Sequence, residues 1–241
     1  MRYFIELSYF GKNYHGWQIQ PDASSIQEEL NKAISVVLQE KISVVGAGRT
    51  DTGVHASQMF AHFDSDTILD KNIVFKLNSV LPEDIVVYQV EKVNDEKHAR
   101  FDALTRSYEY NIWLGRNPFL LDTTWQLSHQ KLDVNAMNEA AKILLEFENF
   151  QAFSKVKTEV KTFNCNVTKA VWIVNGNELV FHITANRFLR NMVRAIVGTL
   201  VDVGKHKITK EDFRNIILSK DRSNAGLSVP AKGLFLTEIT Y

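Results

Sequence analysis

The order of strand and helix patterns over the first 93 residues limits the folds open to this chain more than any other feature. Strands are expected where apolar residues alternate or form short runs, and helices where apolar residues recur every three to four positions. In chain order the expected elements are a strand at 3–9, a helix at 26–38 capped by Ser25, strands at 42–45 and 58–63, a helix at 72–81 and a strand at 85–93. This order is that of a ferredoxin-like α+β sandwich.

The second half of the chain has a similar order of elements. The expected elements are a strand at 106–114, a helix at 134–145 capped by Asp133, and a hairpin of 167–174 and 178–184 turning at Asn175-Gly176. They continue with helices at 189–204 and 209–219, the second capped by Thr209, and a final strand entered from the loop 225–236. Neither a fixed-period repeat nor a Pro/Gly/Ser-rich linker divides the sequence. The chain thus has two stretches of similar element order, residues 1–104 and 105–241, without a repeat in sequence.

The composition argues against several classes of protein. With 241 residues, 45% of them apolar, the chain can bury a substantial core, and none of its apolar runs approaches membrane-spanning length. Cys165 is the only cysteine, which excludes an internal disulfide and fits a reducing cytoplasm. The seven histidines lack ligand spacing, so we expect no metal site. Because the formal net charge is zero, an anionic partner must meet a local basic patch.

The stretch 46–58 reads Gly-Ala-Gly-Arg-Thr-Asp-Thr-Gly-Val-His-Ala-Ser-Gln and places one carboxylate, Asp51, among three glycines. A loop of this kind can present a carboxylate to a ligand on a rigid scaffold, although Asp in a Gly-rich loop is often only a turn former. The Asp-Thr-Gly sequence also occurs in aspartic proteases, whose paired carboxylates share a proton. Arg49 disfavours that chemistry, because a nearby cation favours two ionised carboxylates. From these residues alone, Asp51 can be either a turn former or a catalytic carboxylate.

A row of polar and basic residues lies at the start of the helix expected at 189–204. Its members, spaced i, i+3, i+4 and i+7, are Arg187, Arg190, Asn191 and Arg194. Such rows usually face solvent, but between 185 and 210 six Lys and Arg residues are accompanied by one acidic residue, Asp202. An uncompensated row suits phosphate binding, or pairing with a carboxylate from elsewhere in the chain.

Aromatic residues leave two questions open. The loop 9–21 is dense in aromatic and amide side chains, which suit either a packed turn around a buried Trp17 or a surface that meets bases or sugars. Tyr108 can be a core residue of its strand. It also lies next to Arg106 at the end of that strand, where a ring can be exposed for stacking.

Six segments together resemble the tRNA pseudouridine synthase A family, and they follow the family's order along nearly the whole chain. They are 9–20 (Y-x-G-x-x-Y-x-G-W-Q-x-Q), 48–56 (G-R-T-D-x-G-V-H-A), 77–82 (L-N-x-x-L-P), 106–110 (R-x-Y-x-Y), 185–194 (A-N-x-F-L-x-x-M-V-R) and 230–236 (P-A-x-G-L-x-L). The first segment departs from the family pattern Tyr-Asp-Gly-Thr, because Phe10 and Lys12 replace its Asp and Thr.

The resemblance implies two ferredoxin-like α/β halves, joined through a continuous, mostly antiparallel sheet with a basic catalytic cleft between them. It implies a homodimer that uses no cofactor. The implied reaction is the isomerisation of uridine to pseudouridine at positions 38, 39 and 40 of the anticodon stem-loop of tRNA. A sequence without a nucleotide-binding loop agrees with a reaction that consumes no energy source. A stacked uridine must first be flipped out of its stem.

The same resemblance implies roles for individual residues. Asp51 is the nucleophile or essential carboxylate, and Arg194 pairs with it and keeps it ionised. Tyr108 stacks on the flipped uracil and can take part in proton transfer. Arg49 fills the space that the base leaves, and Leu234 packs against the base. Charge alone suggests three phosphate contacts, which are Arg187, Arg190 and Lys205.

Two other functions compete with this hypothesis. A non-catalytic tRNA-binding protein would need the basic surface but not Asp51. A hydrolase built on Asp51 and His55 is a weaker alternative, because the sequence places neither a water-activating metal nor a second carboxylate nearby.

Overall fold

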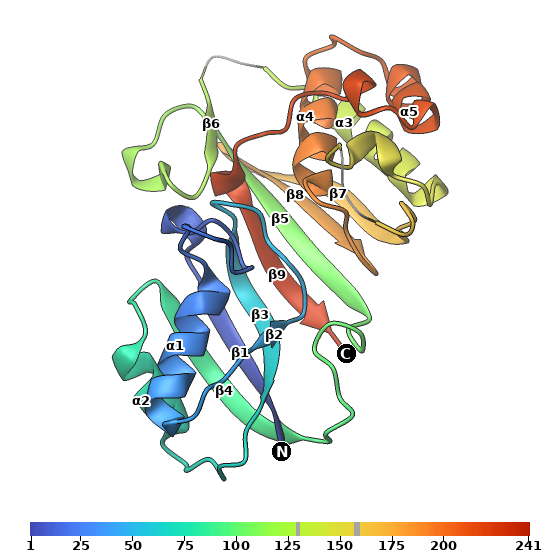
Figure 1. Cartoon of the computed structure of the whole chain (residues 1–241). Helices are drawn as coiled ribbons and strands as arrows, with labels where there is room; N and C mark the ends of the chain where they lie inside the picture. Colours follow the sequence, from blue (N-terminus) through green and yellow to red (C-terminus); the bar gives the residue numbers. More distant parts are fainter. Residues whose placement is uncertain (129–130, 157–159) are drawn as a thin grey trace. The chain divides into compact units, whose positions relative to one another are not determined.

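The computed structural model describes residues 1–128, 131–156 and 160–241, which form two compact units (Figure 1). The first unit contains Met1–Leu104 and Phe235–Tyr241, and the second contains Thr105–Leu234. The change of unit between Leu104 and Thr105 lies where the two expected halves meet. The last seven residues, expected in the second half, belong to the first unit.

The first unit has the element order expected from its sequence. Its elements are β1 (Arg2–Tyr9), α1 (Ile26–Leu38), β2 (Val45–Gly46), β3 (His55–Asp64), α2 (Ile73–Val80) and β4 (Ile85–Val93). β1 lies between β3 and β4 and is antiparallel to both, and β2 pairs antiparallel with β3. The strand order β4-β1-β3-β2 confirms the ferredoxin-like prediction for this unit. β9 (Leu234–Thr240) is added in parallel to the start of β3, with Phe235 opposite His55.

The core of the first unit lies on one side of this sheet. Every second residue of β1 is buried, beginning with Tyr3 and Ile5, while the residues between them are partly exposed. The apolar face of α1 buries Ile26, Leu30 and Ile34, and α1 packs beside α2 (Figure 1). α1 begins where the Ser25 hydroxyl accepts the Glu28 N–H, as the sequence predicts.

The prediction of a strand at 42–45 is wrong for most of this segment, because in β2 only Val45 and Gly46 pair with β3. Side chains of α1 hydrogen-bond to the backbone N–H and carbonyl groups that would otherwise pair with a neighbouring strand. The Val44 N–H donates to Asn31 and its carbonyl accepts from Gln27, each over 2.8 Å, and the Ile42 N–H donates to Ser35 over 2.9 Å. Ile42 and Val44 are buried, so the apolar run does belong to the core.

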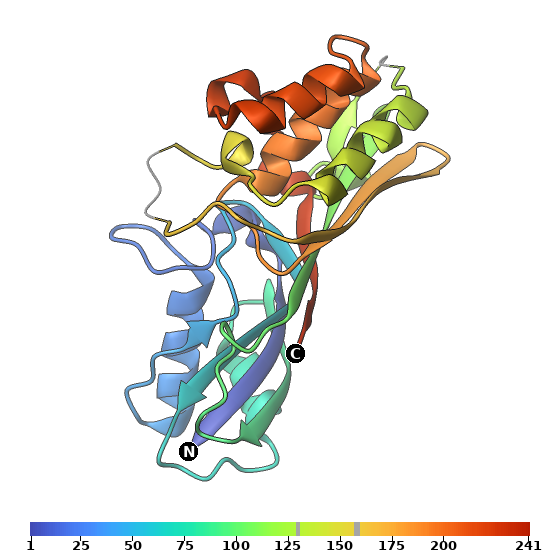
Figure 2. The ribbon, with the colours of Figure 1, turned by 90° about the vertical axis from the view of Figure 1, so that its right-hand side faces the viewer.

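In its described residues, the second unit has a three-stranded antiparallel sheet, an added short strand and three α-helices. Its elements are β5 (Thr105–Leu114), β6 (Trp125–Leu127), α3 (Val134–Ile143), β7 (Val167–Asn175), β8 (Glu178–Ala185), α4 (Met192–Gly204) and α5 (Lys210–Ser219). β8 lies between β5 and β7, and β6 runs parallel to β5. The helices α3, α4 and α5 pack against one another (Figure 2). Within the described parts of the chain, none of the helices is long and apolar enough to cross a membrane.

The hairpin of the second unit turns one residue later than predicted. Asn175 is the last residue of β7 and pairs with Glu178, so the turn consists of Gly176 and Asn177. Gly176 has φ +60°, a conformation that glycine adopts without a steric penalty.

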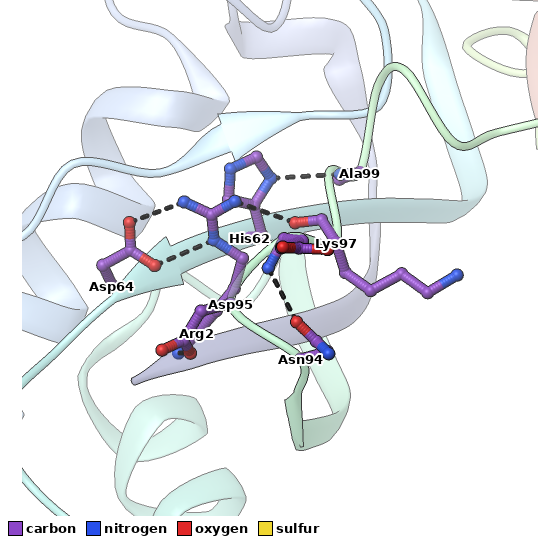
Figure 3. A network of polar contacts seen from close by, with 8 residues as sticks. Arg2, His62, Asp64, Asn94, Asp95, Lys97 and Ala99 are labelled. Atoms are coloured by element: carbon purple, nitrogen blue, oxygen red, sulfur yellow. Dashed lines mark hydrogen bonds and ion pairs between the residues drawn. The ribbon is translucent and has the colours of Figure 1, made fainter.

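A polar network fixes the start of β1 and the segment 94–99 to the sheet of the first unit (Figure 3). The Arg2 guanidinium donates to both oxygens of Asp64, over 2.9 and 2.8 Å, and to the Lys97 carbonyl over 2.9 Å. His62 is 4% exposed, and its Nδ1 accepts the Ala99 N–H over 3.1 Å. Burial, followed by the positive charge of Arg2, lowers the pKa of His62 to about 4.

This lowered pKa predicts that the protein loses stability in mild acid. Unfolded histidine titrates near pH 6.5, so between pH 6.5 and 4 the unfolded chain binds a proton that folded His62 does not. The contribution of His62 to the free energy of unfolding is fully present above pH 6.5. It falls as the pH drops, by about 2 kcal/mol between pH 7 and pH 5. Urea unfolding followed by tryptophan fluorescence at several pH values measures it.

His62→Gln keeps an acceptor for the Ala99 N–H and removes the titrating group, so its unfolding free energy should depend less on pH over this range. His15→Gln changes an exposed histidine and should keep the wild-type pH dependence. An unchanged pH dependence in His62→Gln would show that other groups control acid sensitivity.

Candidate active site

The Asp51 loop connects β2 to β3 through a tight turn. The Val54 N–H donates to the Asp51 carbonyl over 3.1 Å, and Gly53 has φ +75°. Asp51 is half-buried, whereas Arg49 is exposed. β3 begins at His55, three residues earlier than the sequence predicts, so the loop ends immediately after the turn.

The loop 9–17 holds the Asp51 loop in place. The Thr50 carbonyl accepts the Trp17 N–H over 3.3 Å, and the Thr50 hydroxyl lies 2.8 Å from the Tyr9 hydroxyl. The Gly53 N–H donates to the Tyr14 carbonyl over 3.2 Å. Residues on both sides of Asp51 are therefore bound to a single neighbouring loop, which limits the positions open to the carboxylate.

The aromatic residues of the loop 9–21 are mostly packing residues. Trp17 and Tyr14 are 2% and 6% exposed, and the Trp17 indole lies where a side chain at Gly46 would be. The exposed positions of the loop are polar or aliphatic, among them Gln18 and Gln20. Of the two roles considered from the sequence, the structure supports the packed turn for the aromatic rings.

Gly16 allows the close approach of these two loops. A Cβ atom added at Gly16 would lie 2.3 Å from the Thr50 carbonyl oxygen, and Gly16 has φ +92°. We expect Gly16→Ala to lower the free energy of unfolding by at least about 2 kcal/mol and to displace the Asp51 loop. Thermal or urea unfolding measures the effect. Gly48→Ala is the matched control, because a Cβ there meets nothing within 4 Å. Equal stability of the two variants would contradict this account of the contact.

His55 is a packed residue that joins three segments of the first unit. It is 1% exposed, and its Nδ1 accepts the Gly11 N–H over 2.9 Å. Its ring stacks on Phe10 with 4.3 Å between centroids, and the Phe235 ring lies 4.6 Å from it on β9. Phe10, which replaces the Asp of the family pattern, is therefore accommodated by stacking on His55. The same contacts disfavour the hydrolase hypothesis, because the imidazole is buried and its Nδ1 is occupied.

Tyr108 lies at the edge of the second unit's core. On β5 it pairs with Ile183 of β8, and its ring meets Phe188 edge to face with 5.2 Å between centroids. Tyr108 is half-buried, whereas Tyr110, on the same face, is fully buried and donates its hydroxyl to the Pro230 carbonyl over 2.8 Å. On this face of β5 the side chains are therefore less buried toward the N-terminal end of the strand. This is expected for Tyr108, whose ring lies near that end.

The prediction that the residues of the basic row share one helix face is wrong. α4 begins at Met192, so Arg187 and Arg190 belong to the connection that precedes it. Asn191 stops the helix from extending backwards, since it has φ +67° and donates to the Ser228 hydroxyl over 2.6 Å. The Arg190 carbonyl accepts the Lys155 N–H over 3.0 Å, which also fixes this connection. Arg190 is exposed and Arg187 is half-buried.

Arg194 is the one arginine of that row on α4, in its first turn. Its Nε–H donates to the Val229 carbonyl over 2.7 Å, and its own carbonyl accepts the Val229 N–H over 3.3 Å. These two bonds fix the half-buried guanidinium against the segment that leads to Leu234, which is 6% exposed. The sequence gives no signal for this pairing, because the two residues are 35 positions apart.

The structure separates Lys205 from the other basic candidates. Lys205 follows the last residue of α4, eleven positions after Arg194, which places it about 16 Å farther along the helix. Its Nζ lies 5.9 Å from the centre of the Trp125 ring. The second unit thus holds Tyr108, Arg187, Arg190, Arg194 and Leu234 together with a separate Lys205, while Asp51 and Arg49 lie in the first unit.

Comparison with known proteins gives one consistent result. A family model described as tRNA pseudouridine synthase matches residues 7–102 and 140–241. The tRNA pseudouridine synthase A of Parabacteroides distasonis is 49% identical over 243 residues, covering 100% of this chain and 96% of the relative. The proteins of the same name from Bacteroides thetaiotaomicron and Clostridium acetobutylicum are 50% and 40% identical, covering 100% and 98% of this chain and 90% and 98% of those relatives.

Proposed function

Because the chain belongs to the tRNA pseudouridine synthase family, a family of isomerases, we propose that it converts uridine to pseudouridine at positions 38, 39 and 40 of the tRNA anticodon stem-loop. The observation that carries the proposal is the Asp51 loop. A half-buried carboxylate stands on a tight turn whose neighbouring residues are bound to a second loop. This arrangement suits a carboxylate that must meet a reacting nucleotide in a fixed position.

The reaction is an isomerisation in which one bond replaces another. The bond from ribose C1′ to N1 of uracil breaks, the uracil rotates, and a bond from C1′ to C5 forms. C5 loses its proton and N1 gains one, so the atoms balance without a second substrate. A uridine within the stem must leave the stack before a protein carboxylate can meet it, at a cost of about a few kcal/mol. Asp51 attacks or activates the flipped nucleotide.

Side chains of the second unit complete the proposed chemistry. Arg194 pairs with the Asp51 carboxylate, which favours its ionised form. The guanidinium suits this task because its Nε is anchored on Val229 and it carries further donors. Tyr108 stacks on the flipped uracil and assists proton transfer at C5.

Contacts with the surrounding RNA are also proposed. Arg49, exposed beside Asp51, enters the space that the flipped base leaves, and Leu234 packs against the base. Three basic residues contact phosphates, and these are Arg187, Arg190 and Lys205. Since the net charge is zero, such contacts must come from local groups of this kind.

We propose in addition that the protein acts as a cytoplasmic homodimer. The proposal follows the family, and the single buried Cys165 is compatible with a reducing compartment. Light scattering of the purified protein should give twice the mass of one chain, and a monomeric mass would contradict it.

Mapping the product on defined RNA tests the proposed function. Unmodified anticodon stem-loops with a single uridine at position 38, 39 or 40 are incubated with the protein, and pseudouridine is detected by carbodiimide modification and primer extension. We expect conversion at each of the three positions, and none at a uridine in the acceptor stem of a full tRNA. Conversion only outside the anticodon arm would contradict the proposed site.

A further inference from the structure

The segment between β5 and β6 presents an aromatic ring to solvent. Phe119 is 92% exposed, the highest value for a large apolar side chain among the described residues. Leu121, on the same short turn, is 52% exposed. A Phe ring in water has no stabilising role in the second unit itself, and single exposed apolar residues are common. The surroundings of the ring therefore decide whether it has a role.

The backbone that carries Phe119 is held by a set of hydrogen bonds. Asn117 caps the turn, since its side-chain oxygen accepts the Phe119 N–H over 3.0 Å. Gln126 binds both backbone groups of Asn117, over 3.1 Å to the N–H and 2.5 Å to the carbonyl. The Thr124 hydroxyl donates to the Leu120 carbonyl over 2.8 Å. A fixed turn presents its aromatic ring with little loss of conformational entropy on binding.

Basic residues from three segments lie on this turn or next to the strand β6 that follows it. Arg116 is exposed at its start, and the Lys232 Nζ donates to the Leu121 carbonyl over 2.6 Å. Lys205, at the end of α4, lies over Trp125, the first residue of β6. Within 115–125 the one acidic residue is Asp122. The Phe119 surface is defined here as Arg116, Phe119, Trp125, Lys205 and Lys232.

We propose that the Phe119 surface binds the RNA substrate outside the reacting uridine. Phe119 stacks on an unpaired base, and the three cations contact phosphates on either side of that base. This combination of exposed aromatic rings and cations is how proteins bind single-stranded RNA. A contact with another protein fits less well, because the cores of protein interfaces are depleted in lysine. The inference rests on the proposed function, since it assumes an RNA substrate with unpaired bases.

Direct binding measurements test the proposal without relying on turnover. Fluorescence anisotropy with a labelled anticodon stem-loop gives Kd for the wild type and three variants. We expect Phe119→Ala to raise Kd about 5- to 30-fold, the effect of losing one stacked base. Phe119→Trp should stay within about 2-fold of the wild type, because it keeps a stacking ring. Ile68→Ala, which truncates an exposed apolar residue of the first unit, should leave Kd unchanged.

Two further readouts distinguish base stacking from self-association and from a loss of folding. Binding of RNA should quench the additional tryptophan emission of Phe119→Trp relative to the wild type. Light scattering of Phe119→Ala should give the wild-type mass, and its unfolding midpoint should match that of the wild type because the ring is exposed. An unchanged Kd in Phe119→Ala would overturn the proposal. So would a change in mass, which would show that the surface meets a second copy of the chain.

Failure of this inference can be distinguished from failure of the proposed function. If the wild type forms pseudouridine and Phe119→Ala binds RNA normally, only the Phe119 surface is wrong. If Phe119→Ala weakens RNA binding and the wild type forms no pseudouridine, the surface stands and the proposed reaction is wrong.

Discussion

Asp51→Asn is expected to abolish pseudouridine formation while the protein still folds and binds tRNA. Asparagine has nearly the shape of aspartate but lacks the charge and nucleophilicity of a carboxylate. Replacing a group that forms or activates the reacting bond reduces kcat by about 10⁴-fold or more. The Asp51 backbone carbonyl, which closes the turn with the Val54 N–H, is kept in this variant. Product formation under single-turnover conditions measures the effect, and anisotropy measures the affinity for tRNA.

Asp66→Asn is the matched control, because it removes an exposed carboxylate of the same unit. Its turnover, Kd and unfolding midpoint should all equal those of the wild type. A loss of tRNA binding in Asp51→Asn would mean that Asp51 shapes the binding surface instead of reacting. Turnover within about tenfold of the wild type would return Asp51 to the role of a turn former.

Arg194→Ala is expected to lower kcat by about 10²- to 10³-fold, with a smaller change in KM. The physical reason is the loss of the cation proposed to pair with Asp51 and orient it. Rates measured over a range of tRNA concentrations give kcat and KM separately.

Arg194→Lys separates charge from geometry. Lysine keeps the positive charge but cannot donate to Val229 and to a second acceptor through a rigid planar group. We expect it to recover less than a tenth of the lost activity. Lys220→Ala, which removes an exposed cation after α5, should keep the wild-type kcat and KM. A wild-type kcat in Arg194→Ala itself would place Arg194 outside the reaction.

Periodicity and capping residues were sufficient to predict most of the fold. The elements of the first unit follow alternating or helical patterns, and the caps Ser25, Asp133 and Thr209 accept N–H groups at the starts of α1, α3 and α5. The failures arose where tertiary contacts override local pattern. The run 42–44 has strand composition, but α1 side chains bind its backbone.

The basic row fails for the same physical reason. Its i, i+3, i+4, i+7 spacing matches a helix, yet Asn191 adopts a left-handed conformation and binds Ser228, 37 residues away. Local spacing carries no information about a bond of that range. The candidate residues could be identified from their motifs, but the tertiary contacts that hold them in place could not. The contact of Gly16 with Thr50, the stack of Phe10 on His55 and the anchoring of Arg194 on Val229 all join distant segments.

Release of the uracil C5 hydrogen is the most direct measure of whether Asp51 carries out the proposed isomerisation. A tRNA labelled with tritium at C5 of its uridines is incubated with excess wild type or Asp51→Asn, and tritium in the solvent is counted over time. We expect release by the wild type up to the equivalent of the uridines at positions 38–40, and none above background by Asp51→Asn at equal tRNA occupancy. Release by Asp51→Asn at a rate close to that of the wild type would contradict the catalytic role of Asp51.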